Sequence, residues 1–146
     1  MSLKESLYKS LYTITGGNAT IKPEDLCCYA YDATGRIFLP DVVVFPASTA
    51  EVSNILAVAS TQNIPVIPRG SGSGMTGGSL AVKGGIVMVM SRMNRILEID
   101  CDNLIAKVEP GVVTGEFHKA VERHGLFYPH DPASSAFCTL GGNLGE

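Results

Sequence analysis

The sequence contains no tryptophan and few charged residues. Only 17% of its 146 residues are charged, and 11 basic against 14 acidic side chains leave a formal net charge of −3. A nucleic-acid groove needs clustered positive charge, so this balance argues against nucleic acid as a partner. The apolar run from Ile86 to Met90 has the length of a strand, and no stretch approaches the roughly 20 apolar residues of a membrane span. We therefore expect no transmembrane segment.

Cysteine and histidine are sparse, and their spacing does not suit a metal site. Successive histidines are six residues apart, about 240° per step on a helix, so no two share a helical face. No Cys-x-x-Cys pair occurs. We predict that the four cysteines are free, buried thiols and that the protein is cytoplasmic; they are Cys27, Cys28, Cys101 and Cys138. Met1 to Ile14 carries charges in a helical pattern, which does not resemble a secretory signal.

Glycine is abundant: there are 16, with five between Gly70 and Gly78 and three between Gly141 and Gly145. They have no period of three, which excludes a collagen helix. An apolar content of 45% allows a packed core to form around these two clusters. The chain has the length of one ordinary domain, yet it ends inside a glycine-rich segment.

Hydrophobic periodicity predicts an α+β fold. A strand at 41–45, a helix that begins with a capping box of Ser48 and Glu51, and a strand at 64–67 form a predicted parallel, right-handed βαβ unit. The other predicted elements are a helix that ends at Gly16-Gly17, a turn at 24–29, a strand at 85–90, an antiparallel hairpin of 96–100 with 104–109, and a helix at 115–124 capped by Thr114. Residues 127–129 are expected to be extended, and those from 130 onward to form a loop.

The segment Pro68–Gly78, PRGSGSGMTGG, carries the strongest chemical signal. Glycine lets backbone amides approach a ligand, and successive amides that converge in such a loop bind anions. Ser71, Ser73 and Thr76 add hydroxyl groups. The natural ligand is a phosphate or a pyrophosphate, and the alternative is a surface loop that binds nothing.

Two nucleotide-binding motifs fit this loop in letters but not in context. Gly72, Gly74 and Gly77 spell GxGxxG, but that fingerprint needs a helix directly after it, and SLAVKGG does not favour one. A P-loop would need lysine where Gly78 stands. We therefore predict neither a Rossmann NAD site nor an ATP or GTP site.

The order of motifs resembles the FAD-binding domain of the vanillyl-alcohol oxidase and p-cresol methylhydroxylase superfamily. Within it, the chain is most similar to the branch of glycolate oxidase and D-lactate dehydrogenase. The motifs that carry the resemblance are PDVVVFP at 40–46, PRGSGSG at 68–74, VEPGV at 108–112, and DPAS at 131–134 leading to TLGGN at 139–143.

The resemblance implies an incomplete FAD-binding domain at 36–146, with a βαβ first subdomain and the start of an antiparallel second subdomain, after an N-terminal helical segment at 1–35. The first glycine loop would hold the pyrophosphate, and the segment 132–143 would lie along the flavin with backbone amides and small side chains. The implied cofactor-binding residues are Pro68, Arg69, Gly70, Ser71, Gly72, Ser73, Gly74, Met75, Thr76, Gly77, Gly78, Pro132, Ala133, Ser134, Cys138, Thr139, Gly141, Gly142 and Asn143.

Three implications concern single residues. Some relatives attach flavin through a histidine in the first loop, but Ser73 stands at that place here, so non-covalent FAD is implied. Arg69 is either a charge partner of the pyrophosphate or a solvent-facing or structural ion pair. His130 is either a neighbour of the flavin or an exposed loop histidine.

For the whole enzyme, the resemblance implies oxidation of a 2-hydroxy acid such as glycolate or D-lactate. Its partners would be the rest of the FAD-binding domain, a substrate domain, an electron acceptor and other oxidase subunits. No catalytic base and no metal ligand is assigned within residues 1–146, so this part alone is expected to lack catalysis. The alternatives are a phosphate- or nucleotide-binding module and a structural fragment that binds nothing.

Overall fold

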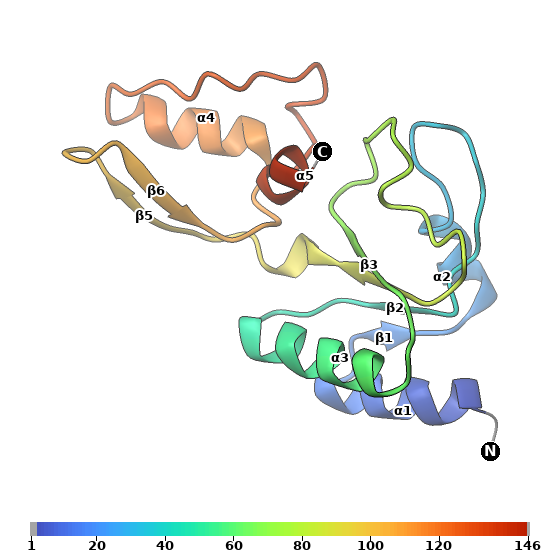
Figure 1. Cartoon of the computed structure of the whole chain (residues 1–146). Helices are drawn as coiled ribbons and strands as arrows, with labels where there is room; N and C mark the ends of the chain where they lie inside the picture. The colour runs from blue at the N-terminus through green and yellow to red at the C-terminus, as the bar shows by residue number, and fades with distance from the viewer. Residues whose placement is uncertain (1–2, 146) are drawn as a thin grey trace.

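The computed structural model describes residues 3–145. It contains a sheet with its helices and, beside it, a hairpin with two further helices (Figure 1). The elements are α1 (Leu3–Ile14), β1 (Ala19–Thr20), α2 (Pro23–Cys28), β2 (Val42–Val44), α3 (Thr49–Thr61), β3 (Val66–Arg69), β4 (Ile86–Val89), the 3₁₀ helix η1 (Met90–Arg92), β5 (Ile96–Asp100), β6 (Ile105–Val108), α4 (Thr114–Glu122) and α5 (Leu140–Gly145). The predicted α+β class is confirmed.

The four-stranded sheet has the order β1-β2-β4-β3. β2 and β3 are both parallel to β4, so the predicted parallel direction is confirmed, but β4 lies between the two strands of the βαβ unit. β1 adds an antiparallel edge. β3 begins two residues later than expected and includes Pro68 and Arg69. Proline is tolerated there because β3 is an edge strand.

Both faces of this sheet are buried. On one face, α1 and α3 pack against alternate strand residues in a core of Leu7, Leu11, Ala19, Val42, Val44, Ile55, Ala59, Ile86 and Met88. The other face buries Leu26, Val43, Ala81, Val87 and Val89. The uninterrupted apolar run at β2 is the pattern of a strand covered on both sides. Since α1 shares a core with β2, the described residues of the predicted N-terminal segment pack together with those that follow, and a boundary at residue 36 stays a prediction.

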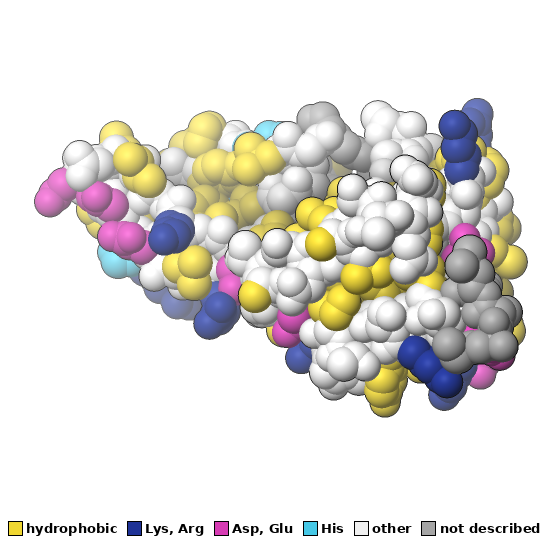
Figure 2. Space-filling view, turned by 60° about the horizontal axis from the view of Figure 1, so that its bottom comes forward, with side chains coloured by type: hydrophobic (Ala, Val, Ile, Leu, Met, Phe, Trp, Pro, Cys, Tyr) yellow, Lys and Arg dark blue, Asp and Glu magenta, His cyan; other side chains and the backbone are white. Residues whose placement is uncertain are grey.

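The second half packs around a smaller core of Val112, Phe117, Val121 and Leu140. The antiparallel hairpin of β5 with β6 confirms the predicted one. Hydrophobic side chains show at the surface at the left of Figure 2, where the hairpin and α4 lie. Leu104, Ile105 and Phe127 are among the large apolar side chains that this half leaves exposed.

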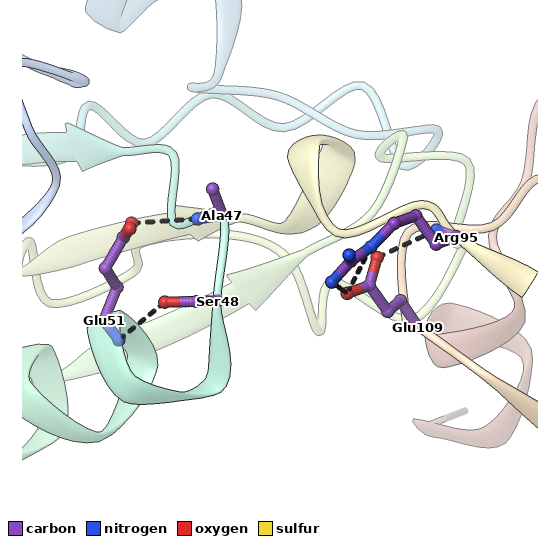
Figure 3. Close-up of polar contacts among 5 residues, drawn as sticks. All are labelled: Ala47, Ser48, Glu51, Arg95 and Glu109. Carbon is purple, nitrogen blue, oxygen red and sulfur yellow. Dashed lines mark hydrogen bonds and ion pairs between the residues drawn. The ribbon is translucent and has the colours of Figure 1, made fainter. Parts of the chain in front are cut away.

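Helix α3 begins at the predicted capping box. The Ser48 hydroxyl accepts a hydrogen bond from the Glu51 amide at 3.2 Å, while the Glu51 carboxylate accepts one from the Ala47 amide at 2.9 Å (Figure 3). The return bond therefore reaches one residue before the cap, where the capping box would place it on Ser48 itself. Two amides at the helix start are satisfied either way.

Three other predictions were wrong in part. Thr114 is not the cap of α4, because Val113 holds that position and Thr114 is the first helical residue. The segment from 130 onward contains helix α5 instead of being loop throughout. All four cysteines are free, but Cys27, Cys28 and Cys101 are exposed and only Cys138 is buried. Cys27 and Cys28 end helix α2, and Cys101 lies in the turn between β5 and β6, where a side chain points away from any core.

No helix within residues 3–145 is long and apolar enough to cross a membrane.

An ion pair closes the base of the hairpin next to the turn that joins the two halves. The guanidinium of Arg95 donates to Glu109 Oε1 at 2.7 Å and 3.2 Å, and the Arg95 amide donates to Oε2 at 2.8 Å (Figure 3). These hydrogen bonds lower the pKa of Glu109 below its ordinary value. The carboxylate side chain is only 8% exposed, whereas that of Arg95 is 70% exposed.

We expect Glu109→Gln to remove part of the acid sensitivity of the fold. A carboxylate with a lowered pKa stabilises the folded state above its unfolded pKa, and this contribution is lost as the pH falls through the lower, folded value. Unfolding by urea at pH 7 and at pH 3 measures it: the loss of stability between these pH values should be smaller in the variant. Lys119→Met, which removes an exposed partner of Glu116, is the control. An unchanged pH difference in E109Q would contradict the role of Glu109.

Candidate cofactor site

The first glycine loop leaves the end of edge strand β3 and returns to β4 without forming a helix. This confirms that the GxGxxG letters lack the helix that a Rossmann fingerprint requires. The amides of residues 71–75 donate to no backbone carbonyl and no side chain among the described residues. Gly72 has a φ of +74°, in the left-handed region that glycine adopts readily. Five consecutive amides are therefore open to an external acceptor.

Arg69 lies beneath this loop, not on its surface. It is 5% exposed, and its Nη1 donates to Ser79 Oγ at 3.3 Å. The guanidinium carbon lies 5.9 Å from the centroid of the Tyr29 ring, within cation–π range. A Cβ added at Gly72 would overlap the guanidinium. The structure thus excludes the solvent-facing alternative for Arg69.

The second predicted segment meets the first at one close contact. A Cβ added at Gly70 would overlap Thr139 Oγ1, so only glycine at position 70 allows this approach. Thr139 comes directly before α5, and its Oγ1 also accepts a hydrogen bond from the Gly142 amide at 3.4 Å. Residues some 70 positions apart in the chain therefore form one site.

Two cavities lie on either side of the contact between Gly70 and Thr139. The larger one measures about 360 Å³ and is lined by Gly70, Ser71, Gly72, Ser73, Gly74, Met75, Thr76, His130, Pro132, Ser134, Cys138, Thr139, Gly142 and Asn143. The smaller one measures about 250 Å³ and is lined by Pro68, Arg69, Gly70, Gly78, Ser79, Met88, Met90, Pro110, Thr139, Gly141, Gly142 and Gly145. The two segments that the sequence singles out are thus brought together.

The match between predicted residues and cavity walls is not complete. Gly77 and Ala133 line neither cavity, while Ser79, Met88, Met90, Pro110 and Gly145 line the smaller one without having been predicted. Sequence order alone could have suggested Ser79, because it follows the loop directly. The walls contributed by β4 and by Pro110 depend on tertiary packing and carry no sequence signal. His130 is exposed and also lines the larger cavity. This position is compatible both with a neighbour of the flavin and with an exposed loop histidine.

A buried polar network forms the floor beneath the second segment. Asn143 Nδ2 donates to Thr114 Oγ1 at 2.7 Å, and that hydroxyl lies 3.2 Å from Cys138 Sγ and 3.3 Å from the Cys138 carbonyl oxygen. Thr114 is fully buried. Its hydroxyl therefore connects the start of α4 to α5, a role that explains why it does not cap its own helix.

The backbone amides of α5 are already occupied. Those of Leu140 and Gly141 donate to the carbonyls of Val112 and Pro110, both at 2.9 Å, and that of Asn143 to Thr139 at 3.0 Å. With the Gly142 bond to Thr139, all four amides at the start of this helix have partners. The start of α5 therefore offers the site no free amide, whereas the amides of residues 71–75 are free.

A third cavity, about 360 Å³ in volume, lies apart from these two in the second half of the molecule. It is lined mostly by apolar side chains of β5, β6, α4 and the segment after α4, including Ile105, Phe117, Leu126 and Tyr128. No predicted cofactor residue lines it. Among residues 3–145, no group of three or more histidine, cysteine or carboxylate side chains is placed to hold a metal ion.

The comparison with known families shows the family of the chain. Residues 40–146 match the family described as the FAD binding domain. The chain belongs to this family. The match covers the strand before α3, both glycine-rich segments and α5, and it supports FAD as the cofactor that the sequence resemblance implied.

Curated relatives of this FAD binding domain include two hydroxy-acid enzymes. The chain is 48% identical over 119 residues to glycolate oxidase subunit GlcD of Bacillus subtilis, which covers 81% of this chain and 25% of that protein. It is 36% identical over 105 residues to D-lactate dehydrogenase of Anaerostipes hadrus, over 72% of this chain and 22% of that protein. The chain thus spans about a quarter of the length of these relatives.

Solved structures confirm the fold. Alkyldihydroxyacetonephosphate synthase superimposes with a TM-score of 0.80 at 26% identity, over 94% of this chain and 28% of that one. p-Cresol methylhydroxylase with bound substrate gives a TM-score of 0.76 at 18% identity, over 96% and 29%. The p-cresol methylhydroxylase type of FAD-binding domain, which the order of motifs implied, is therefore the fold of this chain.

The residues present suit the diphosphate of FAD. Five consecutive amides, at residues 71–75, make no hydrogen bond within the described chain, and mostly glycine and small polar residues line the cavity beside them. An amide row of this kind holds a phosphate by direct hydrogen bonds.

Proposed function

We propose that this chain holds non-covalent FAD in an oxidoreductase that oxidises a 2-hydroxy acid such as glycolate or D-lactate. The observation that carries the proposal is the row of open amides at residues 71–75, beside a cavity that both glycine-rich segments line. The names of the two curated relatives, glycolate oxidase subunit GlcD and D-lactate dehydrogenase, support the substrate class.

In this proposal the first loop binds the diphosphate through its amides. Ser71 Oγ donates to Ser73 Oγ at 3.4 Å, so the two hydroxyls are positioned together at the loop tip. Ser73 offers no imidazole for a covalent link, which is why we propose dissociable flavin. Thr139 and Asn143 shape the opposite wall of the larger cavity.

When bound, FAD supplies the capacity to accept two electrons from the substrate. The residues of this chain bind and orient the cofactor, and we assign none of them as a catalytic base. We propose that the base, the substrate domain and the contacts to an electron acceptor and to other oxidase subunits belong to the remainder of a longer protein. The free thiols suit a reducing compartment, and we propose the cytoplasm.

The apolar face of the second half is the proposed contact with that remainder. Ile105, Phe127 and Leu144 are 63%, 79% and 82% exposed beside the apolar cavity. A cluster of exposed apolar side chains of this kind marks an interaction surface in soluble proteins. The short hairpin of β5 and β6 would then extend into a larger sheet.

Titration calorimetry with FAD, FMN and ADP tests the proposed function. We expect FAD to bind more tightly than ADP by about tenfold or more, because the flavin end adds buried contacts beyond the diphosphate. Equal affinities for FAD and ADP would instead indicate a phosphate- or nucleotide-binding module. Absence of binding by all three, together with a mass that rises with concentration, would indicate a structural fragment.

A further inference from the structure

Arg69, beneath the first glycine loop, and Asp32, in the turn at residues 32–35, are two buried residues of opposite charge. Arg69 and Asp32 are each 5% exposed, although such residues are seldom fully buried unless they are paired. Asp32 Oδ1 accepts hydrogen bonds from the amide and the hydroxyl of Thr34, at 2.9 Å and 2.6 Å. Its Oδ2 is buried and has no hydrogen-bond partner among the described residues. A buried charge without compensation is costly, so the pair requires a structural reason.

Arg69 touches the loop near both of its ends. Nη1 bonds to Ser79 where the loop ends, and the guanidinium fills the space beside Gly72 where a Cβ would otherwise stand. The Tyr29 ring covers the guanidinium at 5.9 Å. Burial lowers the pKa of Arg69, and the charge of Asp32 is the largest influence that opposes this shift. Among the described residues, no ion pair joins the two side chains.

We propose that Arg69 and Asp32 are positioning residues that hold the first glycine loop in the shape that binds the cofactor. Arg69 links Ser79 to Gly72 from beneath, and Asp32 holds the guanidinium there by its charge. The effect on FAD rests on the proposed function, whereas the effect on the loop concerns the chain itself. Direct contact with the pyrophosphate is the competing role for Arg69.

The placement of Arg69 favours support of the loop over direct contact. Arg69 lines the smaller cavity and not the larger one. Residues 71–75, whose amides are unbonded, line the larger cavity. Nη1 of the guanidinium is engaged with Ser79, and Nη2 lies against the Gly72 backbone.

Limited proteolysis of the flavin-free protein by subtilisin measures the loop alone, since cleavage at residues 70–79 reports local opening. We expect about tenfold faster cleavage in Arg69→Met, a smaller increase in Arg69→Lys, which keeps the charge, and a clear increase in Asp32→Asn, which is isosteric. Arg92→Met is the matched control, because Arg92 is an exposed arginine at the end of η1 that donates to the Phe45 carbonyl. It should leave loop cleavage unchanged.

Titration of FAD at increasing salt separates the two roles of Arg69. A positioning residue weakens FAD binding about tenfold when replaced by methionine and leaves the salt dependence of binding unchanged, whereas a direct ionic contact would make the dependence shallower. A shallower salt dependence with unchanged loop cleavage would overturn the proposal. Faster cleavage in R69M combined with no FAD binding by the wild type would defeat the proposed function and leave the positioning role standing. If R69M does not fold, cleavage is measured in Ser79→Ala and D32N instead. Unchanged loop cleavage in both variants would overturn the proposal.

Discussion

Replacement of Gly70 by alanine is expected to weaken FAD binding about 30-fold, because the new Cβ would overlap Thr139 Oγ1 where the two segments of the site meet. Thr139 is 7% exposed and its hydroxyl is engaged with Gly142, so it has little room to move away. Relief of the overlap must separate the two walls of the larger cavity. Fluorescence titration with FAD measures the loss.

The matched test of this contact is the double variant Gly70→Ala with Thr139→Ala. Removal of the Thr139 hydroxyl eliminates the overlap, so the double variant should bind FAD more tightly than the two single losses would predict if they added. Thr139→Ala alone should cost a few-fold in affinity through the lost bond to Gly142. Additive losses, or FAD affinity in G70A within twofold of the wild type, would show that this contact does not shape the site.

The second large effect concerns stability. Gly85→Ala should lower the free energy of unfolding by about 3 kcal/mol. Gly85 has a φ of +96°, which an L side chain adopts only with strain, and an added Cβ would overlap the Pro65 carbonyl oxygen. The residue also pairs with Asp41, whose Oδ2 accepts from the Gly85 amide at 2.7 Å and whose amide donates to the Gly85 carbonyl at 2.9 Å. This is the point where β4 enters the sheet between β2 and β3.

Gly125→Ala is the control for backbone strain without overlap. Gly125 has a φ of +69°, but a Cβ there would meet nothing within 4 Å. Its cost should therefore be about 1 kcal/mol. Denaturation by guanidinium chloride gives both values. Equal losses in the two variants would mean that the Pro65 backbone moves aside, and that strain alone accounts for the effect of G85A.

Local signals in the sequence predicted most of the elements correctly. The apolar run at Val42–Val44 indicated a strand buried on both faces, and Ser48 with Glu51 marked the start of α3. Such signals depend on neighbouring residues, so they can be interpreted without a fold. The prediction for the glycine loop was also local: its composition indicated an anion site, and the residues after it indicated that no helix follows.

Predictions failed where a distant partner outweighs the local preference. Thr114 has a typical capping side chain, but its hydroxyl bonds to Cys138 and Asn143, which lie more than 20 positions away. Helix α5 contains three glycines, which disfavour a helix locally, yet Gly141 packs so close to Pro110 that a larger residue would not fit. Packing against the turn at Pro110 thus outweighs the propensity of the segment.

By itself, the sequence predicted which residues bind a phosphate group, since glycine and small polar neighbours in one short stretch let backbone amides approach an anion. The tertiary structure decided which of the two glycine-rich segments keeps its amides free. The amides of residues 140–143 bond to Val112, Pro110 and Thr139, while those of residues 71–75 bond to nothing in the described chain. It also placed Arg69 beneath the loop, because the positions of Tyr29 and Ser79 around the guanidinium depend on how the strands and loops pack, and no local pattern encodes that.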